Sequence, residues 1–80
     1  MNNSDLFGSC SDLSTAIHLI LDKIEIPHFI HSIYDDHILI YVDDSESQNL
    51  SIECFSKYMF FKSILSGIDE DDDCWIELFF

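Results

Sequence analysis

Residues 29–42 read Phe-Ile-His-Ser-Ile-Tyr-Asp-Asp-His-Ile-Leu-Ile-Tyr-Val, and this stretch decides the fold. Two runs rich in β-branched and aromatic residues, 29–34 and 37–42, flank the polar pair Asp35-Asp36. In the second run every other residue is Ile or Val, which is typical of a strand with one buried face. Because only two residues separate the runs, we expect an antiparallel β-hairpin, although such turns favour Asn-Gly or Asp-Gly over Asp-Asp.

A helix is expected before this hairpin, over residues 13–24. Ser11 or Asp12 can cap its N-terminus, and Pro27 prevents it from continuing toward the first strand. Residues 1–10 are expected to form a loose arm. The apolar residues of this helix recur at intervals of three and four, the spacing of one helical face: Leu13, Ile17, Ile20, Leu21 and Ile24.

A second helix is expected after a polar loop at residues 43–48. Asn49 or Ser51 can cap it, and it would run to about Ser66. Gly67 would then provide the left-handed residue that ends many helices. The side chains close to one stripe of this helix are Phe55, Tyr58, Met59, Lys62 and Leu65, all apolar or aromatic except Lys62.

A last strand is expected over residues 74–80, after the acidic run 69–73. It would present Cys74, Ile76, Leu78 and Phe80 on one face and Trp75, Glu77 and Phe79 on the other. The order is then α-β-β-α-β. This predicts one α+β domain over residues 1–80, with a three-stranded sheet and both helices packed on one face. If Trp75 and Phe79 lie on the face away from the helices, they offer a dimer interface.

The charge is unusual for a chain that can fold. Sixteen acidic residues accompany three lysines and no arginine, for a formal net charge of −13, yet 48% of the residues are hydrophobic and 14% aromatic. Acidic disordered segments lack such apolar content, and ordinary folded surfaces mix both signs of charge. The composition therefore favours binding to a strongly basic protein surface. It disfavours direct binding to nucleic acid or to an anionic membrane.

The expected topology places the carboxylates at two rims. A helix of about 16 residues and a strand of about seven have similar lengths, roughly 24 Å and 23 Å, so the helix would return the chain to the hairpin turn. The main partner-binding rim would hold Asp35, Asp36, Asp69, Glu70, Asp71, Asp72 and Asp73. The opposite rim would hold Asp22, Glu25, Asp43, Asp44 and Glu46, with Asp43, Asp44 and Glu46 as a secondary partner-binding group.

No metal or cofactor is expected. The Asp69-x-Asp71-x-Asp73 pattern resembles the start of an EF-hand loop, but that loop needs Gly at its sixth position and Glu at its twelfth. Those positions here are Cys74 and Phe80. No Cys-His spacing of a zinc site surrounds the four histidines, which are His18, His28, His31 and His37.

No enzymatic activity is expected either. The chain has no recognised nucleophile signature and no Gly-rich phosphate loop, and a domain of this size is expected to have little room for a pocket of several hundred Å³. The odd number of cysteines, Cys10, Cys54 and Cys74, favours reduced thiols over a disulfide framework. With no secretory signal and no apolar run of about 18 residues, a cytoplasmic location is expected.

At class level the chain resembles small acidic phage-encoded inhibitors, namely anti-CRISPR proteins and DNA-mimic anti-restriction proteins. The features that carry this resemblance are the length, the charge, Asp35-Asp36, Asp43-Asp44 and the run 69–73. It implies a non-enzymatic inhibitor that covers the nucleic-acid-binding surface of a host defence complex, such as a CRISPR effector or restriction enzyme. Two alternatives remain open: an immunity protein or antitoxin for a basic nuclease toxin, and a small structural or regulatory homodimer.

Overall fold

A computed structural model describes residues 13–80 and shows a mixed α+β fold with the order α-β-β-α-β-β. The expectations for the arm at residues 1–10 and for a cap at Ser11 or Asp12 lie outside the described residues. The elements are α2 (Leu13–Lys23), β1 (His28–Ile33), β2 (His37–Val42), α3 (Ser45–Phe55), β3 (Ser63–Ile68) and β4 (Cys74–Phe79). All strand pairs are antiparallel, and the sheet order is β1-β2-β4-β3.

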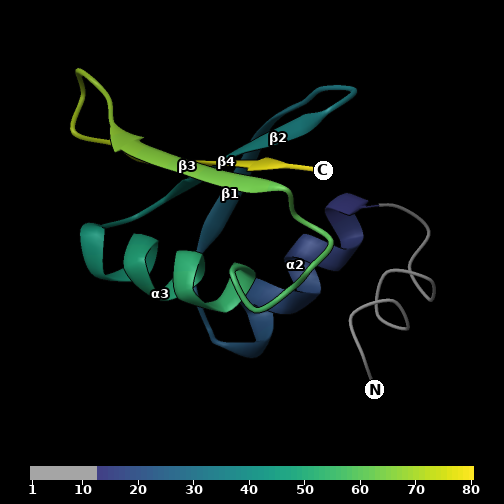
Figure 1. Cartoon of the computed structure of the whole chain (residues 1–80). Coiled ribbons are helices and arrows are strands. Elements are labelled where there is room, and N and C mark those ends of the chain that lie inside the picture. The colour runs from purple at the N-terminus through teal and green to yellow at the C-terminus, as the bar shows by residue number, and fades with distance from the viewer. Residues whose placement is uncertain (1–12) are drawn as a thin grey trace.

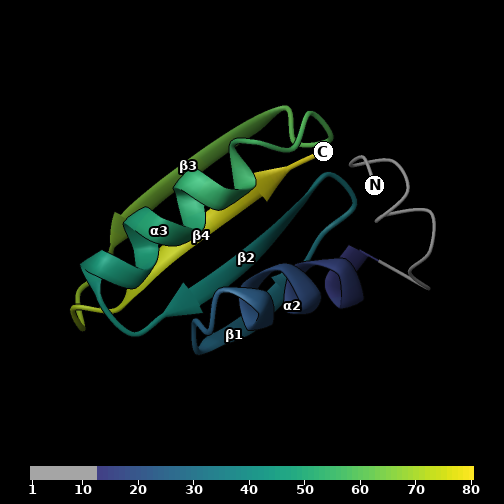
Figure 2. The same cartoon turned by 90° about the horizontal axis from the view of Figure 1, so that it is seen from below.

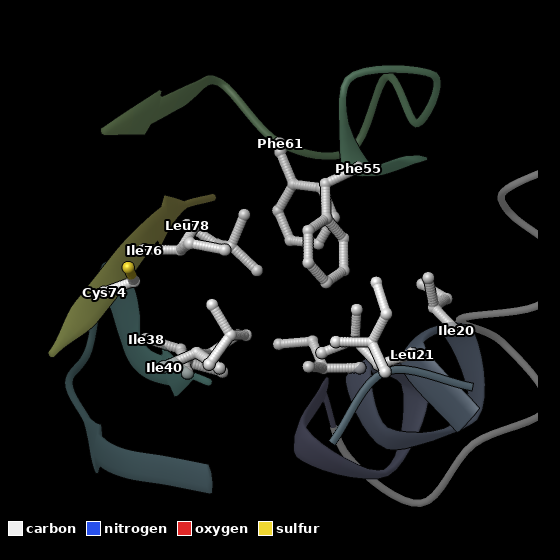
Figure 3. Close-up of a cluster of buried hydrophobic side chains, with 12 residues drawn as sticks. Ile20, Leu21, Ile38, Ile40, Phe55, Phe61, Cys74, Ile76 and Leu78 are labelled. Carbon is white, nitrogen blue, oxygen red and sulfur yellow. The ribbon is translucent and has the colours of Figure 1, made fainter. Parts of the chain in front are cut away.

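Both helices cover the same face of the sheet, as the sequence predicts (Figures 1 and 2). The core lies between the layers, where side chains of α2 and α3 meet the inward-facing residues of β2 and β4 (Figure 3). Its largest fully buried hydrophobic side chains are Ile17, Leu21, Ile38, Ile40, Phe55, Ile76 and Leu78. No helix covers the opposite face of the sheet in the part of the chain that the structure describes.

Helix α2 follows its apolar pattern except at Ile24, which lies beyond the end of the helix and is 39% exposed. Ile17, Ile20 and Leu21 are buried, together with Ala16. The helix ends because Glu25 adopts a left-handed conformation, with φ of 58°, and the Ile26 amide donates to the Leu21 carbonyl at 3.0 Å. A residue in this conformation commonly terminates a helix. With eleven residues each, neither described helix is long and apolar enough to cross a membrane.

The second helix and the number of strands differ from expectation. Helix α3 begins at Ser45 rather than near Asn49, because the Asp44 side chain accepts the Ser47 amide at 2.7 Å and caps it. It ends at Phe55, and the segment expected to continue it contains the strand β3. The apolar stripe was therefore wrong beyond Phe55: Met59, for example, is 93% exposed.

The extra strand makes a four-stranded sheet in place of the expected three. Every residue of β3 pairs with β4, from Ser63 opposite Phe79 to Ile68 opposite Cys74. Gly67 lies within this strand without a positive φ, so it is not a helix cap. Without the antiparallel strand β3, β4 would be an edge strand with unpaired backbone groups beside the core.

Candidate functional site

One end of the sheet gathers seven of the sixteen acidic side chains. Val42, the last residue of β2, pairs with Cys74, the first residue of β4. The acidic loop before Cys74 therefore lies beside the acidic turn that follows Val42. We call this group the acidic rim, and it consists of Asp43, Asp44, Asp69, Glu70, Asp71, Asp72 and Asp73.

The expected grouping of the acidic loop with Asp35 and Asp36 was wrong. His37 pairs with Phe79, and the Phe80 amide donates to the Asp36 carbonyl at 3.0 Å, so the Asp35-Asp36 turn lies beside the C-terminal residue. A strand of six residues, about 20 Å, separates this turn from the acidic rim. The prediction failed because a helix to Ser66 would have delivered the loop to the turn, whereas β3 carries the chain back to the other end.

Asp69 organises the acidic loop. Its carboxylate accepts the backbone amides of Asp71 at 2.9 Å and Asp73 at 3.0 Å. Its own amide donates to the Asp73 carbonyl at 3.0 Å, and its carbonyl accepts the Asp72 amide at 3.1 Å. Asp69 is half-buried, while Glu70, Asp71 and the two residues after it are exposed. One carboxylate therefore builds the loop, and four others are presented to solvent.

The loop concentrates negative charge in a small volume. Carboxylate oxygens of Asp69, Asp71 and Asp73 lie within 4.8 Å of one another. Charges this close still repel each other at physiological salt, where the screening length is about 8 Å. These three are the group in residues 13–80 whose oxygens could share a cation, although exposed acidic side chains commonly gather without one.

On the other side of the rim, Asp44 caps a helix, and Asp43 is exposed to solvent. Asp44 caps α3, and the hydrogen bond from the Ser47 amide holds the pKa of its carboxyl below the ordinary value. Asp43 and Glu46 are exposed, with Glu46 in the first turn of the helix, where negative charge is favourable. Of the opposite-rim residues, Asp43, Asp44 and Glu46 thus lie beside the acidic loop, not opposite it.

A cavity of about 550 Å³ opens beside the acidic rim, over the ends of β1 and β2. This differs from the expectation that so short a chain has little room for a pocket of several hundred Å³. Aromatic rings and carboxylates share its lining, which includes Phe29, His31, Tyr41, Asp43, Asp69 and Asp73. The rings contact each other edge to face, with centroids 6.2 Å apart for Phe29 and His31 and 5.5 Å apart for His31 and Tyr41.

Tyr41 connects the cavity to the acidic loop. Burial raises the pKa of its hydroxyl above the ordinary value of 10.0, and the nearby carboxylate of Asp69 raises it further by charge and by a hydrogen bond. Asp73 and Asp71 act in the same direction through their charge. The phenol therefore remains a neutral hydrogen-bond donor in a strongly negative environment.

The sheet face away from the helices continues from this cavity. Trp75, Glu77 and Phe79 lie on it, as predicted, because Cys74, Ile76 and Leu78 alternate with them and are buried. At the far end the rings of Tyr34, His37 and Phe79 form a stack, with centroids 4.3 and 4.7 Å apart. His37 also contacts Asp36 at 2.7 Å and Glu77 at 3.4 Å. The contact with His37 lowers the pKa of Asp36.

The remaining candidate residues have structural surroundings. Cys74 is buried and Cys54 is half-buried; both are free, and burial raises the pKa of the Cys54 thiol. Cys10 lies outside the described residues. The His18 Nδ1 and His28 Nε2 atoms lie 2.5 Å apart, and His28 Nδ1 lies 2.9 Å from the Ile26 carbonyl, to which it donates. This pair joins α2 to the start of β1.

Sequence reasoning missed the cavity residues Phe29, His31 and Tyr41 as part of a site. A usable signal did exist for the β3–β4 hairpin, whose loop residues Asp69 and Asp73 line one side of the cavity. Ile64, Leu65 and Ile68 lie directly before the acidic run, the segment Cys74–Phe79 alternates directly after it, and Asp69 is a typical turn residue. Reading these two runs as a hairpin would have moved the acidic loop to the correct end of the sheet.

No protein-family model matches this chain, and neither a curated protein nor a solved structure matches it significantly.

Proposed function

We propose that this protein is a non-enzymatic acidic inhibitor that binds the basic, nucleic-acid-binding surface of another protein through its acidic rim. The partner class is the one implied by the resemblance to anti-CRISPR and DNA-mimic anti-restriction proteins: a CRISPR effector, a restriction enzyme or another nuclease. Asp35 and Asp36 lie at the other end of the sheet, so the proposal leaves them out of this contact.

The observation that carries the proposal is the gathering of seven carboxylates from two separate chain segments at one sheet end. Nucleic-acid-binding proteins are built to neutralise a dense row of phosphates, one negative charge per about 1.7 Å of duplex axis. Glu70, Asp71 and Asp72 are exposed on a loop that backbone hydrogen bonds hold in place. A preorganised row of charges loses little freedom on binding and speeds encounter with a positive surface.

Electrostatic repulsion within the rim also favours binding to a basic partner. Repulsion among its carboxylates raises the free energy of the unbound protein, and a basic partner relieves it. No lysine belongs to the rim, and the charge cannot be balanced from within the chain, which has only Lys23, Lys57 and Lys62. An acidic partner or a nucleic acid would add to the repulsion.

The experiment is a tagged pull-down from lysate of the natural host, washed at low and at high salt, with mass spectrometry of the bound proteins. We expect a nucleic-acid-binding complex that is retained at low salt and released at high salt. The rim variant Asp71→Asn/Asp72→Asn/Asp73→Asn should lose it. The matched control is Asp22→Asn/Asp35→Asn/Glu53→Gln, which removes the same charge from exposed sites outside the rim and should retain the partner.

Equal retention of the partner by the rim variant and the control would overturn the proposal. Loss of the partner from both would mean that net charge, and not the rim, governs binding. The immunity-protein alternative predicts the same biochemistry with a nuclease toxin as partner, and it is separated by the gene neighbourhood: an immunity gene lies beside its toxin, an anti-defence gene in phage or mobile-element DNA.

The uncovered sheet face favours a second candidate, a homodimer through Trp75, Phe79 and their neighbours. Phe29, Tyr34 and Leu65 are 62%, 49% and 52% exposed, which is a large aromatic and aliphatic surface for a small domain. The net charge opposes self-association, so such a dimer should tighten with salt. Analytical ultracentrifugation at low and high salt tests this: a monomer at all concentrations and salts excludes it.

A further inference from the structure

The cavity beside the acidic rim combines two features that neither the rim nor the sheet face has alone. Phe29, His31 and Tyr41 supply aromatic rings, and Asp69 and Asp73 supply carboxylates, within one hollow of about 550 Å³. That volume is within the usual range of ligand sites, about 300–1,000 Å³. The strand pairing of Phe29 with Tyr41 and the hydrogen bonds of Asp69 hold these groups on rigid elements.

From this combination we propose that the cavity is an anchor site for an arginine side chain of the basic partner. The guanidinium would stack on the Phe29 and Tyr41 rings and pair with the carboxylates of Asp69 and Asp73. This inference rests on the proposed function, because it names the group on the partner that the acidic rim would hold in place.

Charge selects a cationic occupant. Asp43, Asp69 and Asp73 line the cavity, and no lysine is among its lining residues in the described part of the chain. A second copy of this chain carries the same charge of −13 and would be repelled. Aromatic faces attract cations through their negative π-surface, and the attraction is stronger where water is excluded.

Within the cationic class, the mixed lining favours arginine over lysine. A guanidinium is planar, stacks on aromatic rings and can donate two parallel hydrogen bonds to a carboxylate. A lysine ammonium is a compact, strongly hydrated charge that gains less from a flat ring. Tyr41 and Asp69 line the same cavity, so one guanidinium can meet a ring and a carboxylate together.

The test uses the full chain and two short capped peptides of equal length and charge, one alternating glycine with arginine and the other glycine with lysine. Binding is followed by ¹⁵N–¹H NMR. We expect the arginine peptide to bind about three- to tenfold more tightly, the size of a partly desolvated cation–π contact. The largest shifts should occur at Phe29, Tyr41 and the 69–73 loop. General attraction to a negative protein acts equally on both peptides and cancels in the affinity ratio, and the variants below assign the remaining preference to the cavity.

Phe29→Leu should lower that ratio without changing the net charge, and its ring is exposed enough for the fold to survive its loss. The matched control is Tyr34→Leu, which removes an exposed ring from the same sheet face at the opposite end and should leave the ratio unchanged. As a second variant pair, Asp73→Asn should weaken binding of the arginine peptide more than Asp35→Asn does.

Equal affinities for the two peptides, shifts centred on Asp35 and Asp36, or an unchanged ratio in Phe29→Leu would each overturn the anchor site. The proposed function is judged separately, by the pull-down with the rim variant. If that variant loses its basic partner while the peptides show no arginine preference, the anchor site fails and the acidic rim stands. If the peptides show an arginine preference but the rim variant keeps its partner, the cavity binds arginine and the proposed function of the acidic rim fails.

Discussion

The indole of Trp75 lies across Gly67, its cross-strand partner, so closely that a methyl group at position 67 would come within 2.6 Å of the ring. The pair occupies the uncovered face of the β3–β4 hairpin. Gly67 lies two residues before Asp69, and Trp75 lies two residues after Asp73. Glycine within a strand is destabilising because it has no side chain to pack. An aromatic ring that packs over it shields the exposed backbone and compensates in part. The contact therefore supports the hairpin that presents the loop.

Gly67→Ala should destabilise the protein by about 1–3 kcal/mol, the usual cost of overpacking, because the indole must shift or leave its position. Ser66→Ala, at the neighbouring exposed position, is the control and should change little. Urea denaturation followed by Trp75 fluorescence measures both. A Gly67→Ala variant as stable as the wild type would show that the indole does not need this site.

Gln48 is the polar link between α3 and the same hairpin. Its side chain is buried, and its Nε2 atom donates to the carbonyls of Gly67 at 2.8 Å and Trp75 at 2.9 Å. Gln48→Met keeps a similar shape but removes both donors, and should lower the free energy of unfolding by about 1–3 kcal/mol. The control is Asn49→Ala at the exposed neighbouring position. Equal stability of the two variants would contradict this account.

Asp44 should make stability depend on acid pH through its cap. Its pKa is lowered from 3.8, first by the Ser47 amide, so the stabilisation is fully present above pH 3.8 and is lost as pH falls through the lower folded pKa. Asp44→Ala should therefore be less stable than wild type at neutral pH. The difference in stability between the two proteins should shrink as pH falls below 3.8. Asp44→Asn keeps a capping oxygen and should remain close to wild type at neutral pH. Thermal melts across this pH range decide the matter.

Local patterns were sufficient for the parts of the fold that the sequence predicts. The β1–β2 hairpin follows from two β-rich runs around a two-residue turn, and α2 follows from its stripe of Ile17, Ile20 and Leu21. The outward placement of Trp75 and Phe79 follows from strict alternation in the last strand. In each case the signal lies within a dozen neighbouring residues.

Where the pattern was ambiguous, tertiary contacts decided. Residues 55–65 have apolar spacing that suits a helix, but β4 offers an open edge that β3 satisfies with hydrogen bonds along its whole length. That one error also misplaced the acidic loop, because each added strand reverses the direction of the chain. The cavity was beyond local reasoning, since Tyr41 and Asp69 are far apart in sequence and meet only through the sheet order.

Tyr41 should report the state of the acidic loop. Its pKa lies above 10.0, mainly through burial and then through Asp69, Asp73 and Asp71. Asp69→Asn removes the nearest charge and should lower the pKa of Tyr41, although burial keeps it raised. A pH titration of ¹³C-labelled tyrosine rings by NMR measures this, with Tyr41→Phe to assign the signal and Asp35→Asn as the distant control. Because the folded pKa is raised, Tyr41 stabilises the fold up to about pH 10 and ceases to do so as pH rises through the folded pKa.

Salt should stabilise the free protein, because it screens the repulsion within the acidic rim. Raising ionic strength from about 0.01 M to about 1 M shortens the screening length from about 30 Å to about 3 Å, less than the spacing of most rim charges. We expect the melting temperature to rise by several degrees over this range. The rim variant Asp71→Asn/Asp72→Asn/Asp73→Asn should melt higher at low salt and respond less to added salt.

The control for this effect is Asp22→Asn/Asp35→Asn/Glu53→Gln, which has the same net charge but leaves the rim intact. If repulsion is concentrated in the rim, where carboxylate oxygens approach within 4.8 Å, the control should keep most of the salt dependence. An equal reduction in both variants would mean that the charge acts as a diffuse cloud over the whole molecule. Repulsion within the rim would then be no stronger than elsewhere on the protein, and a basic partner would gain no particular advantage by binding there.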